Sequence, residues 1–403
     1  MGQRKHRQKK KRGCFGCILV VMILLLCVEM IVAAGLFHGV IRDKLTAYFS
    51  PEIPYQEVTI DKKDLEKKYY YAQLTEEEKT AYAEISQGIR DQADEIYVHS
   101  SDAKRTNKLL EFVLKDSPEF FWCDGTAKTT SYEGKENYTV LKPAYLCSGE
   151  ERKRRQEEID SEVEKCLGKI NENSTDYDKI LSVFDYIVDT VDYDSDAEDN
   201  QNIYSVFVGK KSVCAGYSKA TQYLLEKLGV FCTYVTGKTK SGENHAWNLV
   251  ICEGDYYYVD TTWGDPVFLN EEEAVNKDLF SYDYMCCNDE ELFRTHVPDS
   301  DVNLPECSKM DYNYYVVNDM YFEKCDGDII LDCMNDTISK QENPSLFKFS
   351  DPEVYEKAKQ EIFGNIIEQA AKNLSQWYGL RKVKYTYIDD PKLNKIVIYW
   401  EYK

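Results

Sequence analysis

Cys214 stands at the start of a segment in which apolar residues recur with the period of a helix. The run GKKSVCAGYS covers residues 209–218, and the helical spacing begins at Tyr217. Free backbone N–H groups and the helix dipole stabilise a thiolate at such a position, and the same groups can hold a developing oxyanion. Lys210 and Lys211 add positive charge nearby. A cysteine at a helix start is also a common structural feature, so the chemistry depends on finding a base for it.

His245 is the candidate base. The chain has five histidines, of which the first two lie in or beside its basic and apolar N-terminal segment: His6, His38, His99, His245 and His296. His245 opens an expected strand over 245–252, which a turn joins to a second strand over 256–263. Folding this hairpin sets Asp260 across from His245 or one diagonal away on the same face. A carboxylate there accepts the imidazole N–H and orients the ring for proton transfer.

These positions predict a triad of Cys214, His245 and Asp260, and we expect His296 to be structural. A metal site made of the triad residues is disfavoured, because it would contain one soft ligand and the chain offers no fourth ligand at a suitable spacing. We therefore expect neither a metal nor another cofactor.

The elements around the triad are a mixture of helices and strands. Helices are expected at 75–89, which opens with a capping box of Thr75 and Glu78, and at 102–115, 150–170, 176–190 and 352–378. Helix and strand alternate between 200 and 268, and the second strand of the hairpin ends at Asp265-Pro266. Residues 301–350 are irregular with short strands, and a hairpin of 383–388 and 395–402 closes the chain.

The same segments resemble a known family. KSVCAGYSKATQYLLEKLGVFCTYVTG (211–237) and NHAWNLVICEGDYYYVDTTWGDP (244–266) are similar to the core of the transglutaminase-like superfamily, and DSPEFFW (116–122) and SYDYMCCNDEELFRTH (281–296) are more loosely similar to its bacterial members. The resemblance implies an α+β, papain-like fold, in which a helix bearing the cysteine packs on an antiparallel sheet bearing the histidine and the aspartate. It implies that Cys214 is the nucleophile, His245 the general base and acid, and Asp260 the orienting carboxylate.

In such a site the thiolate attacks an amide carbonyl and forms a thioester, while His245 protonates the leaving amine. Water then completes hydrolysis, whereas an amine completes transamidation, so peptidase and transglutaminase both stay open. Gln201 and Tyr204 are weak candidates for a second oxyanion donor. Trp247 and Trp263 flank the expected triad, and they either wall the cleft or pack in the core. The alternative to an enzyme is a non-catalytic cell-envelope scaffold or binding module that retains the fold.

The N-terminus predicts a membrane anchor. Residues 1–13 form a basic cytoplasmic tail with seven Lys/Arg among residues 4–12, and residues 14–37 carry a single charge, Glu29. A helix over 14–37 rises about 36 Å, enough to cross a hydrocarbon core of about 30 Å. Basic residues before the span place the N-terminus in the cytoplasm and the catalytic body outside the cell. The alternative is a secreted protein with a cleaved signal peptide, since small residues at 32–34 suit a cleavage position.

The charge distribution agrees with this orientation. The chain has 403 residues and a net charge of −21. Residues 1–43 hold eight Lys/Arg and two acidic residues, whereas the other 360 residues hold 42 Lys/Arg and 69 acidic residues. This acidity excludes a general nucleic-acid binder. We expect a protein or peptide substrate, such as a cell-wall peptide of a bacterial cell envelope, and membrane contact through the N-terminal helix. The spacing of the fourteen cysteines does not reveal disulfides.

The length predicts two or three domains. The expected order after the membrane helix is a stalk at 38–70, a mainly helical region at 71–172, the transglutaminase-like core at 173–300 and an α+β C-terminal region at 301–403.

Overall fold

The computed structural model describes residues 52–134, 136–171, 173–265 and 280–402, and only positions 22, 30, 32 and 35 before them. The expected basic tail, membrane helix and first part of the stalk therefore lie outside the described residues, apart from those four positions. Within the described ranges, none of the helices combines the length and the apolar character needed to cross a bilayer. The chain from Tyr55 onward forms one compact unit.

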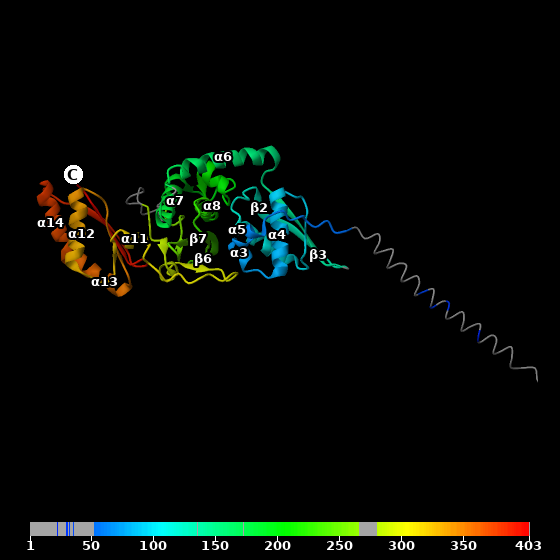
Figure 1. The fold of residues 1–403 in the computed structure, drawn as a ribbon. Helices are drawn as coiled ribbons and strands as arrows, with labels where there is room; N and C mark the ends of the chain where they lie inside the picture. Colours follow the sequence, from blue (N-terminus) through cyan, green and yellow to red (C-terminus); the bar gives the residue numbers. More distant parts are fainter. Residues whose placement is uncertain are drawn as a thin grey trace, which may run out of the picture. The chain divides into compact units, whose positions relative to one another are not determined.

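The first part of this unit combines four helices with a small sheet (Figure 1). The helices are α2 (Lys62–Glu66), α3 (Tyr69–Ala72), α4 (Glu76–Asp91) and α5 (Ala103–Asp116). The strands are β1 (Ile96–Val98), β2 (Cys123–Tyr132) and β3 (Tyr138–Tyr145), in the order β1-β3-β2. Helix α4 begins with the predicted capping box, in which Thr75 and Glu78 satisfy each other's backbone N–H groups.

This part differs from the expectations in two features. The segment just before residue 70 is not a free stalk, because Leu65 and Tyr70 are buried in the core and Thr59 N donates to Gln87 Oε1 at 3.0 Å. The region 71–172 contains the expected helices α4 and α5, and it also contains a long antiparallel hairpin of β2 and β3 that was not expected. Most β2 side chains are exposed, so this strand lacks the alternation of apolar residues that would reveal it.

The central part places a helix on an antiparallel sheet, as an α+β core requires. Its helices are α6 (Gly149–Leu167), α7 (Asp176–Thr190), the π-helical turn η1 (Ser205–Gly209), α8 (Cys214–Lys227) and α10 (Asp289–Leu292). Its sheet has the order β10 (His296–Pro298), β6 (Cys232–Thr239), β7 (Asn244–Cys252), β8 (Asp255–Val259) and β9 (Met285–Cys287), beside a short parallel pair, β4 (Asp192–Tyr193) and β5 (Lys211–Ser212). Helix α8 packs on β6 and β7, and α7 packs on α8 (Figure 1).

The C-terminal part has its own hydrophobic core. It contains α11 (Tyr314–Val317), β11 (Tyr321–Phe322), α12 (Gly327–Lys340), β12 (Ser345–Phe349), α13 (Pro352–Glu361), the π-helical turn η2 (Ile362–Ile366), α14 (Ile367–Tyr378), β13 (Tyr385–Asp390) and β14 (Lys395–Trp400). The sheet order is β11-β12-β14-β13, so the predicted closing hairpin is present. Helix α12 lies in a region expected to be irregular, and it covers this sheet together with α14.

Candidate active site

Cys214 is the first residue of α8. The residue before it is Val213, whose apolar side chain cannot cap the helix. Gly216 N donates to the backbone carbonyl of Val213 at 2.9 Å, so the first-turn N–H groups that can hold an oxyanion at the cysteine are those of Cys214 and Ala215. The thiol is partly exposed and contacts a small cluster that includes Ala246, so the strand that carries His245 lies against the start of the helix.

His245 is the second residue of β7, and Asp260 follows the end of β8. Asn248 pairs with Val259 in the ladder of the two strands, and continuing that register puts Asp260 one diagonal away from His245. The structure brings these side chains together, since His245 Nε2 lies 2.7 Å from Asp260 Oδ2. Strand β8 is shorter than expected, because the chain leaves the ladder at Asp260.

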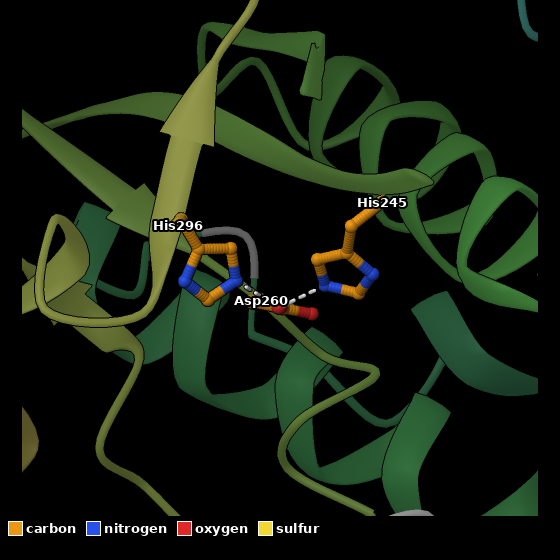
Figure 2. Close-up of side chains that lie close together, drawn as sticks. All are labelled: His245, Asp260 and His296. Carbon is orange, nitrogen blue, oxygen red and sulfur yellow. Dashed lines mark hydrogen bonds and ion pairs between the residues drawn. The ribbon is translucent and has the colours of Figure 1, made fainter. Parts of the chain in front are cut away.

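The carboxylate of Asp260 is saturated with hydrogen bonds. Oδ1 accepts from the backbone N–H groups of Thr262 and Trp263, at 2.9 and 3.2 Å. Oδ2 accepts from His245 Nε2 and also from His296 Nε2, which lies 3.1 Å away (Figure 2). Burial raises the pKa of Asp260, but the charges and hydrogen bonds of the two histidines outweigh burial. They hold the pKa well below its usual range, so the carboxyl stays ionised.

The ionised Asp260 controls the protonation of His245. Burial lowers the pKa of His245, but the charge and hydrogen bond of Asp260, followed by those of Cys214, raise it to about 10. Because Nε2 is committed to Asp260, Nδ1 is the ring atom left for the Cys214 thiol. The order of groups is therefore thiol, imidazole and carboxylate, and it favours a thiolate–imidazolium pair.

Side-chain hydrogen bonds fasten the segment that carries Asp260 to the helix that carries Cys214. Tyr217 Oη donates to Asp265 Oδ2 at 2.8 Å, and the Thr221 and Thr261 hydroxyls lie 3.1 Å apart. All four side chains are buried. Asp265, expected only to end the strand, thus helps to align two parts of the candidate site.

The weaker candidates lie in different surroundings. Gln201 follows Asn200, whose carbonyl accepts from Val213 N at 3.3 Å, so Gln201 lies beside the start of α8. The Tyr204 hydroxyl instead donates to Glu158 Oε2 at 2.9 Å and is not free to serve as an oxyanion donor. Trp247 is fully buried, with its ring centroid 6.0 Å from that of His245, and belongs to the core. Trp263 is half-buried, its ring centroid lies 5.7 Å from that of His245, and this position suits a cleft wall.

The two lysines before Cys214 are paired with acids. Lys210 Nζ lies 3.1 Å from Glu162 Oε2, and Lys211 Nζ lies 3.0 Å from Asp194 Oδ2. Their positive charge is largely neutralised, so the helix start and His245 are the main features that stabilise a thiolate here.

His296 is the residue that sequence analysis underestimated. It lies on β10, which pairs with β6 on the side away from β7, and Thr239 is its partner in that ladder. Gly237 of β6 permits the close approach of β10 to β6, because a Cβ at this position would lie 2.3 Å from Val297 O and 2.6 Å from Trp247 Cη2. The scarcity of histidines was the one available signal, since 36 residues separate His296 from Asp260.

Within the described ranges, the group of acidic, histidine and cysteine side chains compact enough to hold a metal ion is His245, Asp260 and His296. Their ligand atoms lie within 4.8 Å of one another. Both Nε2 atoms, however, hydrogen-bond to one oxygen of Asp260, so an ion would have to displace both protons. The eleven cysteines from residue 123 onward are free thiols, and Cys214 interacts with His245 of this group.

Comparison with known proteins agrees with this geometry. Residues 165–261 match the model of the transglutaminase-like superfamily, so the chain contains a transglutaminase-like domain with an α+β core. The matched segment includes Cys214, His245 and Asp260.

Individual relatives are distant. Mouse kyphoscoliosis peptidase is 26% identical over 149 residues, covering 32% of this chain and 22% of the relative, so the match spans about a fifth of that protein. A crystal structure of a TGase is 16% identical, with a TM-score of 0.26 over 46% of this chain and 54% of that one. A candidate cysteine protease from Cytophaga hutchinsonii is 15% identical, with a TM-score of 0.23 over 34% and 62%.

Proposed function

We propose that the protein is a cysteine-dependent acyl-transfer enzyme acting on peptide amides, with Cys214 as nucleophile, His245 as general base and acid, and Asp260 as orienting carboxylate. The observation that carries the proposal is the bond of 2.7 Å between His245 and Asp260, on a ring that also interacts with the Cys214 side chain at the start of α8. A purely structural histidine has no need of a partly exposed thiol on one side and a saturated carboxylate on the other.

The chemistry balances with these groups alone. The Cys214 thiolate attacks the amide carbon, the first-turn N–H groups hold the oxyanion, and the C–N bond breaks as His245 transfers its proton to the leaving amine. In the second half, His245 takes a proton from the incoming nucleophile, which displaces the thiolate. Water gives an acid and an amine gives a new amide. The peptidase name of the mouse relative supports hydrolysis as the outcome to test first.

We also propose that the enzyme is tethered to the membrane, with its body outside the cell. The support is the sequence, with seven Lys/Arg at 4–12 before a segment 14–37 of one charge. The acidic body would favour basic peptides or peptides with free amines, and cell-wall peptides are the substrates to test first. Protease shaving of intact cells tests this part, and protection of the body from added protease would contradict it.

Alkylation of the full chain by iodoacetamide, followed by mass spectrometry, tests the nucleophile. Near neutral pH we expect Cys214 to react at least about tenfold faster than Cys325, because burial raises the pKa of Cys325 to about 11. The advantage should disappear in His245→Ala. Incubation with peptides and a labelled amine then separates cleavage from amine incorporation. Equal rates at Cys214 and Cys325 in the wild type would overturn the proposal and favour a non-catalytic binding module.

A further inference from the structure

We infer that His296 is a positioning residue for the proposed reaction: it donates from Nε2 to the same oxygen of Asp260 that serves His245, and so holds the carboxylate in line with the ring. This inference rests on the proposed function and extends it from three groups to four. Asp260 follows the end of β8, where its backbone N–H still donates to Tyr284 O at 3.0 Å, and two backbone N–H groups hold Oδ1, so the position of Oδ2 depends on the two histidines.

Asp260 and a chain of hydroxyl groups fit the same tautomer of His296. Its Nδ1 lies 2.8 Å from Thr295 Oγ1, and that hydroxyl lies 2.6 Å from Tyr284 Oη. The Thr295 hydroxyl also lies 3.3 Å from Leu292 O, the closer of its two acceptors being Nδ1, and when it donates to Nδ1 the neutral ring carries its proton on Nε2. That proton then points at Asp260, which is the arrangement that a carboxylate acceptor requires.

The surroundings of His296 leave its ring no alternative position. The side chain is fully buried, and its centroid lies 4.7 Å from Trp263, 4.9 Å from Trp247 and 5.0 Å from Tyr284. The ring of His245 is 5.2 Å away, with Asp260 between the two histidines (Figure 2). Such a cage holds the Nε2–H direction with little entropy cost when the site reacts.

A buried histidine on β10 could also serve packing alone. Packing alone, however, does not need a polar ring with both nitrogens in hydrogen bonds, whereas a positioning role needs the Nε2–H in particular. The two roles differ in what replaces the ring, because a side chain of similar length that keeps an N–H donor restores positioning, and one without a donor restores only packing.

The matched variants are therefore His296→Gln and His296→Met in the full chain. Gln offers an amide N–H near the position of Nε2, and Met has the same length without a donor. We expect His296→Met to lower kcat on a cleaved or transamidated peptide by about 10- to 100-fold with KM nearly unchanged, and His296→Gln to retain most of the activity. The rate of Cys214 alkylation below pH 7 should fall in the same order, with its acid limb displaced upward in His296→Met.

The outcomes separate this inference from the proposed function. If wild-type Cys214 shows no selective alkylation and no turnover, the proposed function fails, whatever His296 does. If the wild type is active and both variants match it, or if both lose activity equally while their thermal unfolding stays cooperative, the positioning role of His296 is overturned. If His296→Met fails to fold, His296→Leu, which also lacks a donor, takes its place, and full activity in that variant overturns the role.

Discussion

His245 Nε2 lies 2.7 Å from Asp260 Oδ2, and both side chains are buried. Burial alone would keep the imidazole neutral at physiological pH, since desolvation disfavours the charged form. The carboxylate reverses that preference and raises the pKa of His245 to about 10. The pair therefore keeps a proton available for a leaving amine over most of the pH range in which a thiolate can form.

Asp260→Asn should move the alkaline limb of activity to lower pH. The raised pKa keeps His245 protonated up to about pH 10, and activity that needs the imidazolium is lost above that value. Without the carboxylate, burial is opposed by the interaction with Cys214 but no longer by Asp260, so the pKa of His245 falls and the limb should shift downward by at least about two pH units. The measurement is kcat/KM, or the rate of Cys214 alkylation, from pH 5 to 10.

Asp194→Asn is the control for this shift. Asp194 lies on the segment before β5 and pairs with Lys211, not with the histidines. The pH profile of Asp194→Asn should follow that of the wild type. An unchanged alkaline limb in Asp260→Asn would show that Asp260 does not set the protonation of His245.

Gly216→Ala should disturb the start of α8. A Cβ at Gly216 would lie 1.9 Å from Ser212 Oγ and 3.2 Å from Asn200 O. Ser212 cannot easily move, because its hydroxyl also bonds Ser205 Oγ and Asn200 O at 2.8 Å. We expect the variant to lose about 1–3 kcal/mol of unfolding free energy in urea titrations and to alkylate Cys214 more slowly.

The matched control is Gly209→Ala in the π-helical turn just before this segment. A Cβ there would meet its nearest neighbour, Ser205 Cβ, at 4.0 Å, which is ordinary contact. This variant should unfold at the wild-type urea concentration or slightly above it. If both variants behave alike, the close approach at Gly216 does not support the helix start.

Regular elements with strong local signals were predictable from the sequence. The capping box of Thr75 and the apolar stripe of the helix at 176–190 give α4 and α7 within a residue or two. The hairpin at 245–259 follows from its alternation and turn. Polar strand β2 and helix α12 escaped prediction, because their neighbours in the fold, and not a local pattern, decide what they bury.

Within the candidate site, the separation of two residues along the chain decides whether their contact can be predicted from the sequence. His245 and Asp260 belong to one hairpin, so a register argument brings them together. His296 reaches the same carboxylate from another strand on the far side of β6, and no local rule connects the two positions. The hydrogen bond from the Tyr204 hydroxyl to Glu158 of α6 was equally unpredictable, because Glu158 lies 46 residues earlier in the chain.

Asp116 should make the stability of the protein depend on pH. Its buried carboxylate accepts from Tyr70 N, Tyr71 N and Tyr82 Oη, yet burial is stronger and raises its pKa to about 6. A raised pKa contributes stability that is complete below the unfolded value near 3.8 and is lost as pH rises through 6. Between pH 4 and 7, Asp116→Asn should gain up to about 3 kcal/mol relative to the wild type in urea unfolding.

Glu66→Gln, on the exposed side of the short helix α2, is the control for Asp116. Its unfolding free energy should run parallel to that of the wild type across the same pH range. Parallel curves for Asp116→Asn as well would mean that the pKa of Asp116 is the same in the folded and unfolded states.

Asp283 should tie the central part to the C-terminal part of the chain. Its carboxylate pairs with Lys395 and, at 3.4 Å, with Lys348, whose ammonium also lies 2.6 Å from Glu291 Oε2. Burial raises the pKa of Asp283, but the two lysines outweigh it and lower the pKa to about 2. The stability from this group is therefore present above pH 4 and is lost as pH falls toward 2.

Asp283→Asn leaves Lys395 nearly buried without its acidic partner. We expect this variant to lose about 3–5 kcal/mol of unfolding free energy near neutral pH, the usual cost of removing one partner from a buried pair. The double variant Asp283→Asn/Lys395→Met should recover much of that loss, because it removes the unpaired charge and keeps the apolar stem.

The exposed pair of Lys384 and Glu401 on the same sheet is the control, and Glu401→Gln should cost less than about 1 kcal/mol. A double variant no more stable than Asp283→Asn alone would show that the network is not held by the charge of Lys395.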